Sequence, residues 1–151
     1  MTITVAAVGR MKQGPERALW DDYVRRLNWP VMLHEIEEKR KLPPAKLIAR
    51  EADLMREVLP PRASLVALDS RGKPLDSPAF AKRVAGWMEQ GGGHLAFVIG
   101  GADGLDPALV KEASFVLGFG ALTWPHMLAR VMLIEQVYRA QCILTNHPYH
   151  H

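Results

Sequence analysis

Residues 94–104, HLAFVIGGADG, place a short apolar run directly before a glycine-rich turn. An almost wholly apolar strand is typical of a parallel sheet, because such a strand is buried on both of its faces. Residues 64–68, SLVAL, have the same character. A helical pattern over residues 77–90 separates the two runs, and strand, helix and strand in this order predict neighbouring parallel strands.

Outward from this stretch, short apolar runs alternate with longer amphipathic segments. We expect strands over residues 3–8, 31–36, 64–69, 94–99 and 115–119, and helices over residues 15–27, 45–58, 77–90, 106–113 and 126–144. The third helix should be capped by Ser77, with Pro78 at its first position. The order predicts an α/β fold with helices on both faces of a mostly parallel sheet, in a single domain over residues 1–151.

The composition is that of an ordinary soluble globular protein, with 48% hydrophobic and 23% charged residues. The formal net charge of +3 is a weak lean toward anionic partners, too small for a protein that holds nucleic acid by charge alone. The N-terminus lacks the pattern of a signal peptide, and no uncharged apolar run approaches the ~20 residues that span a bilayer. These features predict a cytoplasmic protein with no membrane partner.

The only cysteine, Cys142, excludes an intramolecular disulfide. Its neighbours Ile143 and Leu144 are apolar, so we expect a small buried hydrophobe rather than a reactive thiol, which needs an electropositive and partly exposed setting.

The C-terminal tail, residues 145–151, carries three histidines within five positions. We expect no metal there, because Pro148 breaks a helical presentation and no carboxylate or thiolate is close in sequence. Tyr149 and His150 can instead stack on a base and exchange protons near neutral pH. A frayed terminus is the alternative.

Ligands of open parallel sheets bind beyond the carboxyl ends of the strands. The turn after Ile99 is one such place, and a dinucleotide motif G-x-G-x-x-G using Gly101 and Gly104 would need glycine at position 99. The acidic residue expected ~20 positions later is also missing, so we do not expect the usual dinucleotide fold. A tight strand-to-helix turn and a loop that lets a ligand approach the backbone both stay open.

The last helix, residues 126–144, carries apolar residues around much of its circumference. Such a helix must be covered on more than one side, which favours a homodimer interface. Glu135 and Arg139 lie four positions apart in the order that favours an ion pair. Arg139 is either half of that pair alone or also a cation that faces the substrate.

Several short motifs stand in one order along the chain. They are Leu68-Asp69 with Gly72-Lys73, Ile99-Gly100-Gly101 with Asp103-Gly104-Leu105, Leu122-Thr123 with Pro125-His126, Tyr138-Arg139-Ala140, and the tail Asn146-His147-Pro148-Tyr149-His150. Together they resemble the small SPOUT-class ribosomal RNA large subunit methyltransferase H family, which methylates N3 of a pseudouridine in large-subunit ribosomal RNA. The resemblance runs the whole length of the chain.

The resemblance implies a fold, a cofactor and partners. The C-terminal part of the α/β sheet would be tied in a trefoil knot, and the protein would be a homodimer packed through the last helix. The cofactor would be S-adenosylmethionine, and the substrate would be 23S ribosomal RNA, on the assembled ribosome. The residues implied to bind the cofactor are Leu68, Gly101, Gly120, Ala121, Leu122, Thr123, Trp124 and Pro125.

The resemblance also implies a methyl-transfer site at Arg139, Tyr149 and His150, completed across the dimer. Arg139 would stabilise the base as an anion, and His150 is the first candidate for the proton acceptor, with Tyr149 stacking on or orienting the base. Trp124 stands where relatives usually carry a smaller apolar residue, and the sequence ends at His151 where they add Arg or Lys. Two other functions stay open: a non-catalytic ribosome-binding factor of the same fold, and a methyltransferase acting on another RNA, such as transfer RNA.

Overall fold

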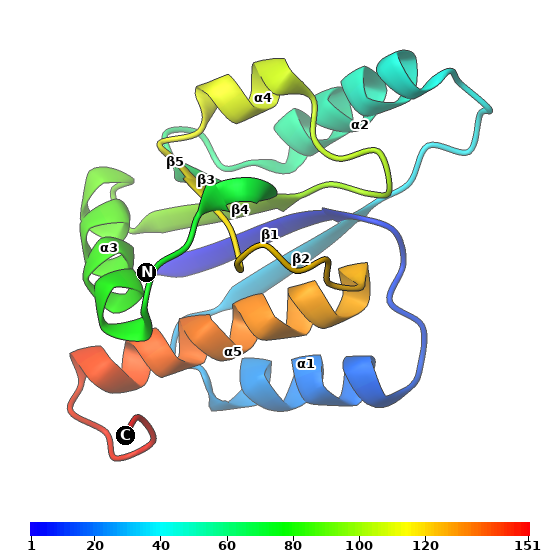
Figure 1. Cartoon of the computed structure of the whole chain (residues 1–151). Coiled ribbons are helices and arrows are strands. Elements are labelled where there is room, and N and C mark those ends of the chain that lie inside the picture. Colours follow the sequence, from blue (N-terminus) through cyan, green and yellow to red (C-terminus); the bar gives the residue numbers. More distant parts are fainter.

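Five strands form one parallel sheet in the computed structural model, which describes residues 1–151 (Figure 1). The strands are β1 Thr2–Val8, β2 Val31–Ile36, β3 Ser64–Lys73, β4 His94–Ile99 and β5 Phe115–Leu117. Their order across the sheet is β2-β1-β4-β3-β5, and every neighbouring pair is parallel. The predicted parallel α/β fold is confirmed, and β4 lies at the centre of the sheet between β1 and β3.

Helices cover both faces of the sheet, as predicted (Figure 1). One face carries α1 Pro15–Arg26, α3 Ser77–Gln90 and α5 His126–Leu144, and the other carries α2 Pro44–Val58 and α4 Pro107–Glu112. Alternate residues of each strand enter the two cores: in β4, Phe97 packs with the first group of helices and Val98 with the second. Because both faces are covered, the strands need apolar residues at successive positions.

Two strand ends differ from the prediction by more than one residue, and one helix cap is a different residue. β3 continues to Lys73 because the strand pairs with β5 a second time after a register shift, so that both Leu68 and Lys73 lie opposite Leu117. β5 correspondingly ends at Leu117 rather than at residue 119. The prediction that Ser77 caps α3 is wrong: the cap is Asp76, whose Oδ1 accepts a hydrogen bond from the Ala79 N–H at 2.8 Å.

The last helix finds most of its cover within the chain. The sheet, α1 and α3 surround α5, and its buried residues include Leu133, Ile134 and Val137, none of which is exposed at all. The apolar circumference of α5 therefore does not by itself require a second copy of the chain. Cys142 is buried in the same core, as predicted.

Two glycines let the backbone touch itself where the chain leaves the sheet. A Cβ atom at Gly72 would lie 2.4 Å from the carbonyl carbon of Leu117, and one at Gly118 would lie 2.6 Å from the carbonyl oxygen of Gly72. This contact holds the start of the loop 118–125 against the end of β3. The threading of the chain that a trefoil knot needs stays a prediction.

None of the helices combines the length and the apolar character that a membrane-spanning helix needs.

Candidate active site

Residues 68–70 of β3 and the loops that follow β4 and β5 line a cavity of about 310 Å³ at the carboxyl edge of the sheet. Six of the eight residues implied to bind the cofactor line it: Leu68, Gly101, Gly120, Leu122, Thr123 and Trp124. Ala121 and Pro125 belong to the same loop and are not among the lining residues. His126 and Ala129, at the start of α5, complete one wall.

The glycine-rich turn after β4 is a tight turn that also forms part of the cavity wall. The N–H of Gly104 donates to the carbonyl of Gly101 at 3.0 Å, and Gly104 has φ 80°, a conformation that side chains disfavour. A Cβ at Gly100 would lie 2.6 Å from the carbonyl carbon of Gly104. The tight turn is confirmed, and the approach of a ligand to its backbone stays a prediction.

The Trp124 side chain bonds to the backbone at the start of its own loop. Its indole N–H donates to the carbonyl of Phe119 at 3.1 Å, and the side chain is 39% exposed while lining the cavity. A large aromatic residue is thus accommodated at this position because the loop folds around it.

The cavity combines apolar walls with a carboxylate. Asp69 lies at its edge with a side chain only 9% exposed, and its Oδ1 accepts hydrogen bonds from the N–H and Nε of Arg71 at 2.8 and 3.3 Å. Apolar side chains such as Leu105 and Phe119 suit a planar ring, and a carboxylate suits a cationic group.

Arg139, Tyr149 and His150 are brought together at the other end of α5. Nη1 of Arg139 lies 3.1 Å from Nδ1 of His150, and the guanidinium lies over the Tyr149 ring, with Cζ 4.8 Å from the ring centroid. Because arginine can only donate, Nδ1 of His150 is the acceptor, and the neutral ring carries its proton on Nε2. The tail is therefore anchored rather than frayed.

The predicted ion pair between Glu135 and Arg139 is confirmed and has further members. Oε1 of Glu135 accepts from Nη2 and Nε of Arg139 at 2.6 and 3.0 Å, and from the hydroxyl of Tyr149 at 3.0 Å. The hydroxyl of Tyr23 lies 3.2 Å from that of Tyr149, and either hydroxyl can be the donor. Tyr23, from α1, was not expected at this site, because nothing in its local sequence distinguishes it from a core aromatic residue.

The electrostatics of this cluster favour a charged arginine and a neutral tyrosine. Burial, then the hydrogen bonds with Tyr23 and Glu135, raise the pKa of Tyr149 well above its usual range. The hydrogen bond to Glu135 raises the pKa of Arg139. Near neutral pH the cluster therefore presents a permanent cation beside a hydroxyl that remains protonated.

The cavity and the cluster are well separated along α5. Arg139 follows His126 by 13 positions, which at 1.5 Å per residue corresponds to about 20 Å. A second cavity of about 670 Å³ lies between α1, the start of α3 and α5, and it shares Phe119 and Gly120 with the first. Tyr23 and Glu135 line this second cavity.

Two of the three tail histidines make contacts within the chain. Nδ1 of His147 accepts from the N–H of Tyr149 at 3.2 Å, and His150 contacts Arg139. No group of three or more His, Cys, Asp or Glu side chains is arranged to hold a metal ion.

Comparisons with known proteins agree over the whole chain. The sequence model of the family described as "Predicted SPOUT methyltransferase" matches residues 1–150. The chain is similar to three curated proteins that are each named "Ribosomal RNA large subunit methyltransferase H". They are 51% identical over 150 residues in Rhodospirillum centenum, 48% over 158 in Bradyrhizobium diazoefficiens and 49% over 150 in Paramagnetospirillum magneticum, each with 99% of both chains covered.

Proposed function

Because the chain belongs to the SPOUT methyltransferase family, we propose that it transfers a methyl group from S-adenosylmethionine to N3 of a pseudouridine in large-subunit (23S) ribosomal RNA. The observation that carries the substrate class is the match over nearly the full length to relatives named as large-subunit ribosomal RNA methyltransferases. The net charge of +3 favours a substrate that supplies much of the recognition through its shape, such as the assembled ribosome in the cytoplasm.

The cavity at the carboxyl edge of the sheet fits S-adenosylmethionine. Its volume of about 310 Å³ is at the lower end of the range for ligand pockets. The backbone of residues 120–125 offers donors and acceptors to the adenine ring, Leu68 and Leu122 offer apolar contact, and Asp69 offers a negative charge to the cationic end. When bound, the cofactor supplies an electrophilic methyl group on a positively charged sulfur.

The residues of the tail cluster perform the steps on the acceptor base. N3 lies on the pairing edge, so the base must be unpaired or extruded before it can react. Arg139 donates to a carbonyl oxygen beside N3 and stabilises the anion left when the N3 proton departs. Since Nδ1 of His150 accepts from Arg139 before the base arrives, transfer of this donor to the base frees Nδ1 to take the proton. Tyr149 stacks on or orients the base.

We propose a homodimer in which the tail of one chain faces the cavity of the other. The separation of about 20 Å along α5 is longer than the reach of the Arg139 side chain, which supports a site completed by a second copy of the chain. Apolar side chains also stay exposed at Leu19 on α1, at Leu122, and at Leu128 on α5. These suit the apolar part of an interface between copies.

The activity is tested with labelled S-adenosylmethionine and ribosomes that lack the modification, with any label mapped to its nucleotide. Label on a large-subunit pseudouridine, absent with Arg139→Ala, is the expected result. Cofactor binding without label on ribosomes would point to another RNA. Neither binding nor label would leave a ribosome-binding factor that has lost the donor.

The composite site is tested by co-expressing two inactive variants, Arg139→Ala and Gly101→Val. If the tail acts on the partner's cavity, mixed dimers hold one intact site each, and random pairing restores about a quarter of the full activity. If tail and cavity act within one chain, no mixed dimer holds an intact site and the mixture stays inactive.

A further inference from the structure

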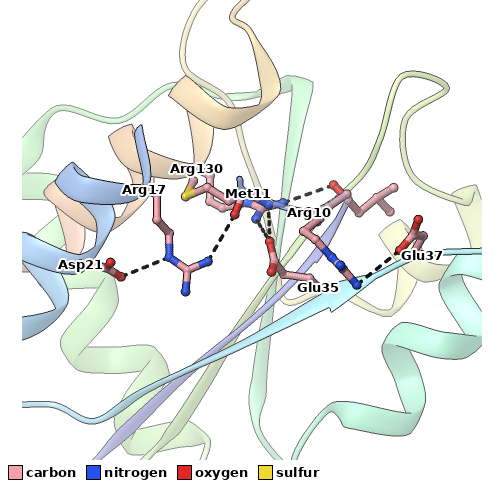
Figure 2. Close-up of polar contacts among 9 residues, drawn as sticks. Arg10, Met11, Arg17, Asp21, Glu35, Glu37 and Arg130 are labelled. Atoms are coloured by element: carbon pink, nitrogen blue, oxygen red, sulfur yellow. Dashed lines mark hydrogen bonds and ion pairs between the residues drawn. The ribbon is translucent and has the colours of Figure 1, made fainter. Parts of the chain in front are cut away.

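Arg130, in the second turn of α5, is the largest fully buried side chain of the molecule and is only 1% exposed. Its guanidinium points at the carboxyl ends of the two strands β1 and β2 (Figure 2). Nη1 donates to Oε2 of Glu35 at 2.8 Å, and Nη2 donates to the carbonyls of Val8 and Gly9, each at 3.2 Å. One side chain thus joins α5 to the carboxyl ends of β1 and β2.

Glu35 extends the network toward α1. Its Oε2 also accepts from the N–H of Met11 at 2.6 Å, and Nη1 of Arg17 donates to the carbonyl of Met11 at 3.2 Å (Figure 2). Arg17 pairs in turn with Asp21, one turn along α1, at 3.4 Å. The segment between β1 and α1 is therefore held from both sides by charged groups.

The energetic balance at Arg130 does not suggest a role in stability alone. Burial lowers the pKa of its guanidinium, against the opposing effect of Glu35, and its buried Nε has no hydrogen-bond partner. A buried ion pair of this kind is often no more stabilising than apolar residues of similar size. The arrangement instead supplies directional bonds, which fix the position of one element on another.

The network touches the cofactor cavity on two sides. Val8, whose carbonyl accepts from Arg130, packs on Gly101, where a Cβ would lie 2.8 Å from Cγ1 of Val8. Ala129, adjacent to Arg130 in sequence, and His126, one turn earlier, line the same cavity as Gly101. The Arg130 contacts therefore link the α5 wall to the glycine turn.

We infer that Arg130 is a positioning residue, which with Glu35 sets the spacing between the first turns of α5 and the glycine turn at Gly101, and so the width of the cavity. The identity of the cofactor in that cavity rests on the proposed function. The positioning itself is a property of the chain alone, and both are open to separate measurement.

The test compares Arg130→Met with Arg56→Met in the full-length protein. Arg56 is the control because it also pairs with a glutamate, joining α2 to Glu112 of α4 at 3.0 Å on the other face of the sheet, and it does not line the cavity. The first readout is amide hydrogen exchange without cofactor, under conditions where both variants are folded by circular dichroism. We expect exchange at residues 100–104 and 118–129 to be about tenfold faster in Arg130→Met only.

The second readout is calorimetric titration with S-adenosylhomocysteine. We expect binding about tenfold weaker in Arg130→Met and unchanged in Arg56→Met. The inference would be overturned if a folded Arg130→Met variant had amide exchange rates and S-adenosylhomocysteine affinity within about twofold of those of the protein without the substitution. If the unchanged protein does not bind S-adenosylhomocysteine, the proposed cofactor fails, while hydrogen exchange still decides the positioning.

A second variant covers the case in which Arg130→Met does not fold. Glu35→Gln keeps the shape of the side chain and one acceptor oxygen but removes the charge that holds Arg130. It should shift exchange and affinity in the same direction by about threefold, whereas a purely structural role predicts a lower melting temperature with both readouts unmoved.

Discussion

Replacement of Gly101 by alanine gives a direct measure of how closely β1 packs against the glycine turn. A Cβ at this position would lie 2.8 Å from Cγ1 and 3.4 Å from Cβ of Val8. Ordinary carbon contacts are 3.5–4.0 Å, so Val8 or the turn must move by about 0.7 Å. Overpacking of this kind costs about 1–3 kcal/mol, and the smaller entropy of the unfolded alanine chain offsets about 0.4–1 kcal/mol.

The expected net loss is about 1–2 kcal/mol of unfolding free energy, or roughly 2–8 °C in melting temperature for a chain of this size. Urea unfolding of Gly101→Ala, Val8→Ala and the double variant forms a mutant cycle. Because Val8→Ala removes the methyl group in the way, we expect the two changes to be non-additive in the favourable direction, by at least ~1 kcal/mol.

Gly100→Ala is the matched comparison, since its Cβ would lie 2.6 Å from the carbonyl carbon of Gly104, a backbone atom that no side-chain truncation removes. It should be more destabilising, and additive with Val8→Ala. Additivity of Gly101→Ala with Val8→Ala to within about 0.5 kcal/mol would refute the packing argument.

Three further predictions concern charges. Arg139→Lys should reduce methyl transfer by at least about tenfold with S-adenosylhomocysteine affinity unchanged, because lysine keeps the charge but lacks the planar fork; equal loss of both, by kinetics and calorimetry, would contradict this. Ultraviolet titration should show Tyr149 still protonated above pH 10, with earlier ionisation in Tyr23→Phe. Because the pKa of Tyr149 is raised in the folded state, its contribution to stability is present below the unfolded pKa of 10 and declines at higher pH. Hydrogen bonds from Arg40 and Arg50 lower the pKa of Glu38 from 4.5 to about 2, and the largest effect comes from the Arg40 side chain. The stabilising contribution of Glu38 is therefore lost as pH falls from 4.5 toward 2. A carboxyl NMR titration of Glu38 in Arg40→Ala should give a higher midpoint, and an unchanged midpoint would refute the role of Arg40.

The periodicity of the sequence predicts the strands and helices because the central strands are buried on both faces and most of the helices on one side. It does not predict that β3 runs on to Lys73, since residues 69–73 are polar and gain their pairing only from a second contact with β5. The cap at Asp76 was equally open to Ser77, because both residues are good caps and only the local backbone decides between them.

The candidate site was predictable to a similar extent. The loop over residues 120–125 and the tail around Tyr149 are motifs contiguous in sequence. Arg130 is different, because in a helix an arginine among apolar residues can also reach solvent along its neighbours. Its partner Glu35 is 95 positions away, and only the sheet order brings the two together.

The position of α5 in the sequence has a consequence for folding during synthesis. Seven of the 24 residues of the larger core come from this helix, which follows the other described helices and strands in the sequence, and they pack in one core with residues of β1 and α1. Folding that proceeds from the N-terminus as the chain emerges cannot complete this core. The nascent chain carries uncovered apolar faces until residues 126–144 have been synthesised, so a product truncated before residue 126 exposes these faces to chaperones, proteases and aggregation.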